Sequence, residues 1–214
     1  MVKDFASNKD VTAVTKPFNT LEEFVKRTKG KSVQSQILKY GRITGSKAHE
    51  ASRCNTTDGM LVELLVGGQK LRNTKAMERG KQLEAMALRR VEQKLERKFK
   101  KCGLFLSEQY PHLGASPDSI DEEFVVEIKC PTSDKSFRTY IDTNNHDKVS
   151  IKYITQMQMQ MLFTGRKKAL FIVADPKFEE INNFKSIIID YDSELIDKLL
   201  IDLNRFWKKF SLDA

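Results

Sequence analysis

The chain has 214 residues, of which 40% are hydrophobic and 31% charged, which suits one domain with an apolar core. No apolar run reaches the roughly 18 residues of a membrane span, and the first residues lack a signal-peptide stretch. We therefore expect a soluble, intracellular protein without a membrane partner, in either a bacterial cytoplasm or a host nucleus. Three cysteines without a CxxC pair and three histidines argue against zinc and a disulfide framework. The net charge of +8 favours a nucleic-acid partner, although solubility alone also explains it.

The first hundred residues are predicted to be mainly helical. Residues 1–19 show no periodicity and are expected to form an irregular arm. Thr20 and Glu23 form a capping-box pattern, which predicts a helix that ends near Gly30. Further helices are expected over residues 33–40, 46–53, 60–66 and 73–98, where capping residues or glycines bound the segments. Residues 20–100 should therefore form a helical layer.

After residue 101 the pattern changes to short strands. Segments rich in apolar or β-branched residues occur at 104–110, 112–116, 124–130, 169–175 and 184–191. A helix is expected over residues 148–163, ending at Gly165, and a last helix over residues 192–210. This order predicts an α/β fold, with a sheet core and a C-terminal helix in residues 101–214. Residues 1–214 are interpreted as a single domain.

The candidate catalytic residues lie in or just before the segment 124–130. Asp118 follows Ser-Pro, and Glu127 and Lys129 follow after a connection rich in acidic residues. In a strand, alternate side chains share a face, so Glu127 and Lys129 should point one way and Ile128 the other. A hairpin of this length would fold Asp118 back beside Glu127. A carboxylate and an ammonium on a largely apolar strand are costly unless they are paired or bind a metal.

Two carboxylates and a lysine suit the hydrolysis of phosphodiesters. Carboxylate oxygens are hard ligands, and Mg²⁺ takes one or two of them and completes its octahedron with water and substrate phosphate. The lysine can orient the attacking water or stabilise negative charge. The alternative is a surface hairpin in which Glu127 and Lys129 form a simple ion pair. The motif with its flanking residues favours a magnesium-dependent nuclease.

The segment GASPDSIDEEFVVEIKCP resembles the active-site motif of the lambda-exonuclease-like, YqaJ-type viral recombinase family. Further similarity lies in GRITGS at 41–46, ERGKQLE at 78–84, KYITQMQMQM at 152–161 and Asp175-Pro176. The resemblance extends from about residue 39 to residue 176. It implies the PD-(D/E)xK restriction-endonuclease-like core, a central mixed β-sheet flanked by helices, here with the helical N-terminal layer.

The resemblance also implies roles for residues around the metal. Asp118 and Glu127 would hold Mg²⁺, for which Mn²⁺ would substitute, with the Ile128 carbonyl as a third ligand. Lys129 would be the catalytic lysine that acts on water. Two residues outside the motif correspond to family positions at the site: the helix-borne acid Glu84 and the glutamine Gln156.

A second set of residues corresponds to family positions that contact the terminal phosphate of DNA. Ser46 and Ser116 match two of these positions. The family's phosphate-gripping arginine lies two residues before the glycine of the G-x-I-T segment, where this chain has Lys39 instead. Arg42 follows that glycine. Because lysine is a point charge rather than a bidentate fork, this departure affects how firmly a 5′-phosphate is held.

The segment 73–98 carries two different faces if it is helical. Glu84 falls within a stripe of residues at three- and four-residue steps, together with Leu88 and Val91. The opposite face is cationic and consists of Arg89, Arg90, Lys94, Arg97 and Lys98. Such a face is either solvated or a track for DNA.

Three functions remain in view. The first is an exonuclease that resects one strand of linear duplex DNA, 5′ to 3′, for recombination by single-strand annealing. Double-stranded DNA, an annealing protein and further copies of the chain are the partners that this function and the resemblance suggest. The second is a structure-specific or non-specific endonuclease of the same superfamily, since a fold does not determine function. The third is a catalytically silent DNA-binding module.

Overall fold

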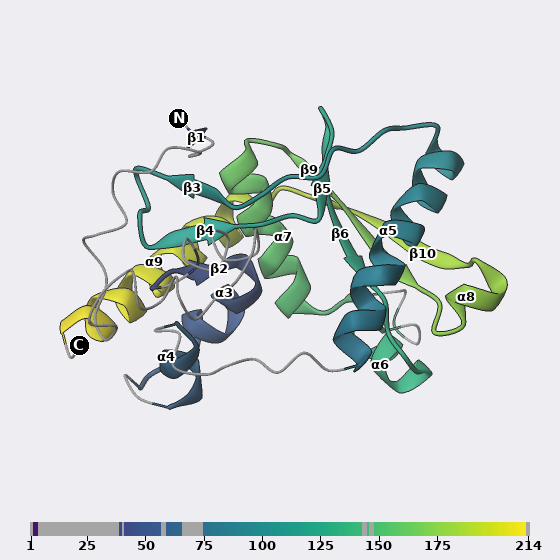
Figure 1. The fold of residues 1–214 in the computed structure, drawn as a ribbon. Helices are drawn as coiled ribbons and strands as arrows, with labels where there is room; N and C mark the ends of the chain where they lie inside the picture. Colours follow the sequence, from purple (N-terminus) through teal and green to yellow (C-terminus); the bar gives the residue numbers. More distant parts are fainter. Residues whose placement is uncertain are drawn as a thin grey trace, which may run out of the picture.

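The structure, a computed structural model, describes residues 2–3, 39, 41–56, 59–65, 75–142, 145 and 148–212. A central four-stranded sheet has the order β10-β9-β6-β5 (Figure 1). Its strands are β5 (Ser119–Ile120), β6 (Phe124–Lys129), β9 (Lys168–Ala174) and β10 (Phe184–Asp190). β6 pairs parallel with β9, while the two outer pairings are antiparallel. The central mixed sheet predicted from the sequence is confirmed.

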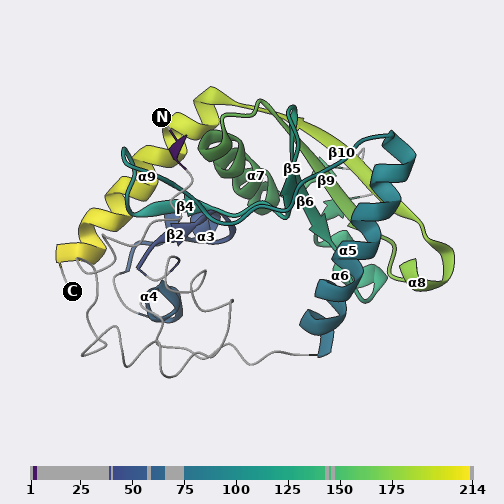
Figure 2. The ribbon, with the colours of Figure 1, turned by 45° about the horizontal axis from the view of Figure 1, so that its top comes forward.

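Two helices cover opposite faces of the central sheet at β6. α5 (Lys75–Leu95) and α7 (Ile151–Thr164) lie on either side of this strand in both views (Figures 1 and 2). Alternate apolar residues of β6 join the cluster that includes Leu83, Ala87 and Val91 of α5. Val125 instead belongs to the cluster of Met157 and Met161 of α7. β6 is therefore buried on both faces.

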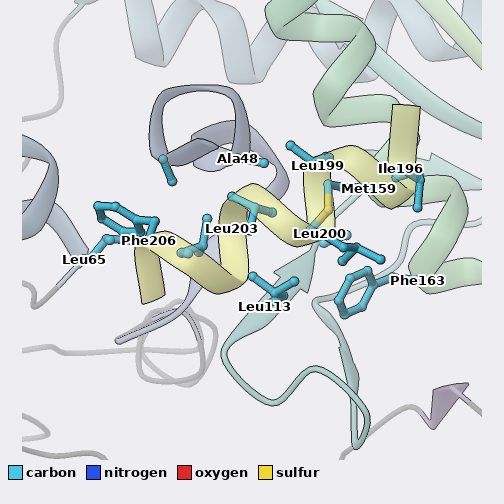
Figure 3. Packing of buried hydrophobic residues seen from close by; sticks show 13 residues of the cluster. Ala48, Leu65, Leu113, Met159, Phe163, Ile196, Leu199, Leu200, Leu203 and Phe206 are labelled. Carbon is cyan, nitrogen blue, oxygen red and sulfur yellow. The ribbon is translucent and has the colours of Figure 1, made fainter. Parts of the chain in front are cut away.

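A second four-stranded sheet of short strands has the order β1-β3-β4-β2. It consists of β1 (Val2–Lys3), β2 (Ile43–Thr44), β3 (Phe105–Ser107) and β4 (Leu113–Ala115). α9 (Ser193–Leu212) packs its apolar side against α3 (Gly45–Ser52), α7 and β4. Figure 3 shows Leu203 and Ile196 of α9 in this core, with Leu113 and Phe163 near them.

Two boundaries differ from the prediction for local physical reasons. α5 ends at Leu95 rather than residue 98, because Glu96 adopts a left-handed conformation with φ of 53°. α7 begins at Ile151 rather than residue 148, because Lys148–Val149 form β8, which pairs with β7 (Ile141–Asp142). α7 ends as predicted, with Gly165 in the left-handed conformation at φ of 72°.

Three short helices complete the described elements. α4 (Met60–Leu65) lies in the segment predicted to be helical. α6 (Asp134–Arg138) and α8 (Phe178–Ile181) were not predicted. α6 is capped reciprocally by Ser133 and Ser136, which differs from the usual pattern with Glu or Gln at the fourth position. The residue types at its start therefore carried no clear helix signal.

Several predicted segments lie outside the described residues. They are the helices expected over residues 20–30 and most of 33–40, and the start of the long helix at residues 73–74. Of the expected arm at residues 1–19, the structure describes Val2–Lys3, which pair with β3. Among the described helices, none is both long and apolar enough to cross a membrane.

Candidate active site

The hairpin of β5 and β6 brings Asp118 to Glu127. Ser119 pairs with Val126 in antiparallel register, so Asp118, one residue earlier, lies opposite Glu127. The Asp118 Oδ2 accepts a hydrogen bond of 2.7 Å from the Ile128 main-chain N–H. The two carboxyl groups and the Ile128 main chain therefore meet at one point of the central sheet.

Glu127 is held by side chains from α7. Its carboxylate is only 2% exposed. Gln156 Nε2 donates to Oε1 and Gln160 Nε2 donates to Oε2, each at 2.6 Å. Lys129 also forms an ion pair with Oε1. Both carboxylate oxygens thus have donors, which offsets the cost of burying the charge.

Lys129 lies between a carboxylate and an aromatic ring. Its Nζ pairs with Glu127 and lies 5.5 Å from the centroid of the Tyr153 ring. Burial disfavours the ammonium, but the Glu127 and Asp118 carboxyl groups outweigh it and raise the pKa of Lys129 above its ordinary value. Lys129 therefore stays charged, and it can donate hydrogen bonds but not serve as a base.

Asp118 lies in an environment that favours its neutral form. Burial and the nearby Glu127 raise the pKa of Asp118 to about 8, against the opposing effects of Lys129 and the Ile128 N–H. The Asp118 carboxyl group therefore holds a proton near neutral pH. A divalent cation between the two carboxyl groups would remove this effect by replacing the proton with positive charge.

Glu84 approaches this cluster from α5. Its side chain is half-buried, and burial raises the pKa of its carboxyl group. Lys129 lowers this pKa and Glu127 raises it, which places both groups within electrostatic range. Glu84 likewise contributes to the raised pKa of Asp118. The structure therefore brings together Glu84 and the three motif residues that the sequence singled out.

The donor set suits a hard cation with few protein ligands. In the described part of the chain, no group of three or more His, Cys, Asp or Glu side chains is placed to hold a metal ion. The ligands predicted from the sequence, Asp118, Glu127 and the Ile128 carbonyl, would instead provide two carboxylates and one main-chain oxygen. Mg²⁺ accepts such a set because water and substrate phosphate complete its coordination.

The residues expected to contact a terminal phosphate lie around the start of α3. Gly45 approaches α7 so closely that an added Cβ would lie 3.2 Å from the Gln156 carbonyl oxygen. Ser46 is exposed in the first turn of α3, and Lys39 is also exposed. Arg42 Nε donates to the Pro111 carbonyl at 2.9 Å, and burial lowers the pKa of its guanidinium. The start of α3 thus borders Gln156, while the Arg42 side chain braces the loop before β4.

Ser116 lies near the cluster through its main chain. Its carbonyl oxygen is 3.5 Å from Gln160 Nε2, the same amide nitrogen that donates to Glu127. Gln160 is 1% exposed, and its own Oε1 is buried without a hydrogen-bond partner among the described residues. The amide orientation is consistent, because a flip would turn this oxygen towards the Glu127 carboxylate.

Sequence reasoning did not assign Gln160 or Arg79 to the site. Gln160 lies one helical turn after Gln156, so their shared face was the available signal. Arg79 on α5 donates to the carbonyl oxygens of Pro131 and Pro176 at 3.1 and 3.0 Å and pairs with Glu179 at 2.8 Å. It therefore ties together the segments that follow β6 and β9, for which the sequence offered no signal.

Comparisons with known proteins identify a family and a fold for this chain. A family model described as "YqaJ-like viral recombinase domain" matches residues 34–167, which include every site residue predicted from the sequence. The fold is similar to an alkaline exonuclease (LHK-Exo) from Laribacter hongkongensis, with a TM-score of 0.71, 24% identity and coverage of 84% of this chain and 93% of that one. Its complex with dAMP gives a TM-score of 0.69, 25% identity and coverage of 82% and 90%.

A more distant exonuclease has the same fold. A phage related exonuclease from Haemophilus somnus 129PT gives a TM-score of 0.62 and 16% identity, with coverage of 84% of this chain and 99% of that one. A search of curated proteins by sequence gave no match. The likeness in fold thus extends over most of the chain.

Proposed function

Because this chain belongs to the YqaJ-like viral recombinase domain family, we propose that it is a divalent-metal-dependent exonuclease. It resects one strand of linear duplex DNA in the 5′ to 3′ direction, and residues 1–214 act as a single nuclease domain. The observation that carries the proposal is the meeting of Asp118, Glu127 and Lys129 at the β5–β6 hairpin. Exonucleases among the structures with this fold support it.

The product of such resection is a single strand with a 3′ end. That product is the substrate of an annealing protein, so we include a single-strand annealing protein among the partners. A homo-oligomer is part of the same proposal, because an enzyme that encloses its substrate stays on the strand it digests.

Asp118, Glu127 and the Ile128 carbonyl would hold Mg²⁺, with Mn²⁺ as a substitute. The proposal is supported by the raised pKa of Asp118, whose causes include burial and the Glu127 carboxylate. Two carboxyl groups forced together in a buried place favour a cation between them. A bound magnesium ion supplies Lewis-acid stabilisation of the negative charge that develops on the phosphate.

The chain's own side chains would position the reacting groups. Lys129, held in its charged form by Glu127, donates a hydrogen bond that orients the attacking water and stabilises negative charge on the phosphate. Gln156 and Gln160 fix the orientation of the Glu127 carboxylate from α7. Glu84 adds a third carboxyl group, from α5, within electrostatic range of Lys129.

Digestion of end-labelled linear duplex tests the proposal, with closed circular duplex as the matched substrate. We expect linear DNA to be shortened from its ends in Mg²⁺ or Mn²⁺, little activity in Ca²⁺ and none in chelator. Cutting of closed circles would favour the endonuclease alternative. Binding without cleavage in any metal would favour the silent DNA-binding module. Full activity in excess chelator would contradict the two-carboxylate metal site.

A further inference from the structure

Exposed basic residues predominate on α5 beyond its first turn, which carries the exposed Glu78. From Lys81 to Lys94, every exposed charged residue of the helix is basic: Lys81, Arg89, Arg90 and Lys94. The acidic residues in this stretch, Glu84 and Glu92, are half-buried, and Glu92 accepts a hydrogen bond from the Phe99 N–H at 2.9 Å. Lys81, Arg89 and Arg90 form no ion pair with any residue that the structure describes. We call these four side chains the α5 basic face; at about 100° per residue they spread around the exposed side of the helix and do not form a single line.

The other long amphipathic helix lacks this charge separation. On α9, the exposed acidic residues Glu194 and Asp197 lie beside Lys198, and Arg205 pairs with Asp202 at 2.9 Å. α9 and α5 lie on opposite sides of the molecule in both views (Figures 1 and 2). The unbalanced charge of α5 is therefore a local feature and does not simply follow from the basic composition.

One end of the α5 basic face reaches the candidate active site. Burial raises the pKa of Glu84, and Lys81 and Lys101 both lower it, so these two lysines lie within electrostatic range of the same carboxyl group that senses Lys129. Lys81 and Lys101 are exposed. Lys81 and Lys101 thus place positive charge near Glu84 on the exposed side of the candidate active site.

The other end of the face leads to a hollow. A cavity of about 360 Å³ is lined by Arg97, Lys98, Lys100, Ile120, Asp121, Glu122 and Arg166. Arg97 is engaged with Asp121 at 2.7 Å, so it braces the β5–β6 hairpin. Lys98 and Lys100 are exposed beside it; Lys98 lies 3.7 Å from the Glu92 carboxylate, and the main chain of Lys100 pairs with Ile120. These two lysines extend the positive charge past the end of α5.

We propose that the α5 basic face, together with Lys98 and Lys100 at the hollow, binds the phosphate backbone of the duplex next to the cutting site. This inference rests on the proposed function and says where its substrate lies. Unpaired arginines can neutralise phosphates there and release condensed counterions.

Two double variants, each of which removes two positive charges, test whether duplex binding depends on the α5 basic face or only on the net charge of the protein. Arg89→Gln with Arg90→Gln removes two charges from the α5 basic face, and Lys198→Gln with Arg205→Gln removes two from α9 as the matched control. Glutamine has a helix propensity close to that of lysine and arginine, so both helices should persist, which thermal melting checks. Duplex affinity is measured in chelator over a series of salt concentrations, so that the readout needs no cleavage.

We expect the slope of log affinity against log salt to fall by about 1.8 in the α5 variant, because each phosphate contact contributes about 0.9. The α9 control should keep the wild-type slope. Hydrolysis of a small single-nucleotide phosphodiester should stay unchanged in both variants, because neither changes a residue of the active site. An unchanged slope in the α5 variant, or an equal loss in the control, would overturn the inference.

The same experiment distinguishes this inference from the proposed function. A wild type that binds duplex but cuts no DNA, with a slope that falls in the α5 variant and not in the α9 control, would overturn the exonuclease and leave the binding surface supported. A wild type that shortens linear DNA, with equal slopes for the α5 variant and wild type, would overturn the binding surface alone.

Discussion

The two faces of β6 have opposite character although they belong to one buried strand. Towards α5, the strand presents only apolar side chains: Phe124, Val126 and Ile128. Towards α7, Val125 is followed by Glu127 and Lys129. The α5-side face gains stability by burying apolar surface, whereas each charge on the α7-side face costs free energy that its partners must offset.

This difference shows how an interior strand can hold reactive groups. The Glu127 carboxylate receives amide donors from Gln156 and Gln160 on α7, and Lys129 balances its charge. The apolar face meanwhile anchors the strand against α5, so the polar face need not contribute to stability. Function should therefore depend on the α7 side, and the free energy of unfolding on the α5 side.

The largest expected effect comes from removing the lysine on the polar face. Lys129→Ala should lower the cleavage rate on the order of a thousandfold, because it removes both an orienting donor and a positive charge. Duplex affinity should hardly change, since one lysine adds little to an interface with many phosphates. Single-turnover digestion and duplex binding in chelator measure the two quantities.

Val126→Ala is the matched change on the apolar face. It should lower the free energy of unfolding by roughly 2 kcal/mol, from lost burial and the cavity left behind, with little change in rate per folded molecule. Denaturant unfolding measures the first quantity. If Lys129→Ala cut DNA near the wild-type rate, or Val126→Ala abolished cleavage in a folded protein, the division between the two faces would be wrong.

Two glutamines of α7 offer a finer contrast. Gln160 donates to Glu127, whereas Gln158 donates to the Asp190 carbonyl at 2.7 Å and accepts from the Asp192 N–H at 2.9 Å. Gln160→Leu should weaken Mn²⁺ binding by about 10–100-fold, because Glu127 loses the donor that orients it. Gln158→Leu should lower the melting temperature but leave Mn²⁺ affinity unchanged. Calorimetric titration with Mn²⁺ decides, and equal metal affinity in the two variants would remove the positioning role of Gln160.

The protonation of Asp118 gives a pH-dependent test. Its folded pKa of about 8 lies above the ordinary unfolded value of about 3.9. Between these values, folding takes up a proton, so the metal-free protein should lose stability as the pH rises through this window and level off above it. Asp118→Asn cannot take up this proton.

Thermal melting in chelator measures the difference between Asp118→Asn and wild type. The advantage of the variant should grow from about pH 4 to about pH 8 and then stay constant. Asp197→Asn on the exposed face of α9 is the control and should show no such trend. A constant difference for Asp118→Asn across this range would mean that burial and the Glu127 carboxylate do not raise the pKa of Asp118 in the folded chain.

The positions of the motif residues could be predicted because they depend on local periodicity. Alternation along one strand places Glu127 and Lys129 on the same face, and a short hairpin returns Asp118 beside them. The α/β fold also followed from the order of the elements, and the mixed sheet with flanking helices followed from the family resemblance. These features involve neighbours that are close in sequence or part of a regular pattern.

The contacts that complete the site could not be predicted in the same way. Helical periodicity indicates that Gln156 and Gln160 share a face, but the meeting of that face with Glu127 is a tertiary contact over 33 residues. Arg79 reaches carbonyl groups 52 and 97 residues away. Residues 148–149 form the strand β8 in place of the predicted start of α7 because they pair with β7. The sequence showed no strand pattern at β7, so this pairing could not be predicted. Tertiary packing decides each of these cases.

The smallest expected effect concerns the 5′ end of the DNA, which we expect to bind near the polar side of β6. The start of α3 abuts α7 at Gln156, and Ser46 is exposed in the first helical turn, where the helix dipole favours an anion. We predict faster digestion of 5′-phosphorylated linear duplex than of 5′-hydroxyl duplex, by about tenfold, since a charge-assisted contact contributes roughly 1.5–3 kcal/mol. The preference should shrink in Lys39→Ala, because lysine stands where the family has its phosphate-gripping arginine. Arg42→Ala should also shrink it, but with a lower melting temperature, because Arg42 donates to Pro111. Equal rates on both substrates in wild type and variants would remove the phosphate site and favour an endonuclease that ignores DNA ends.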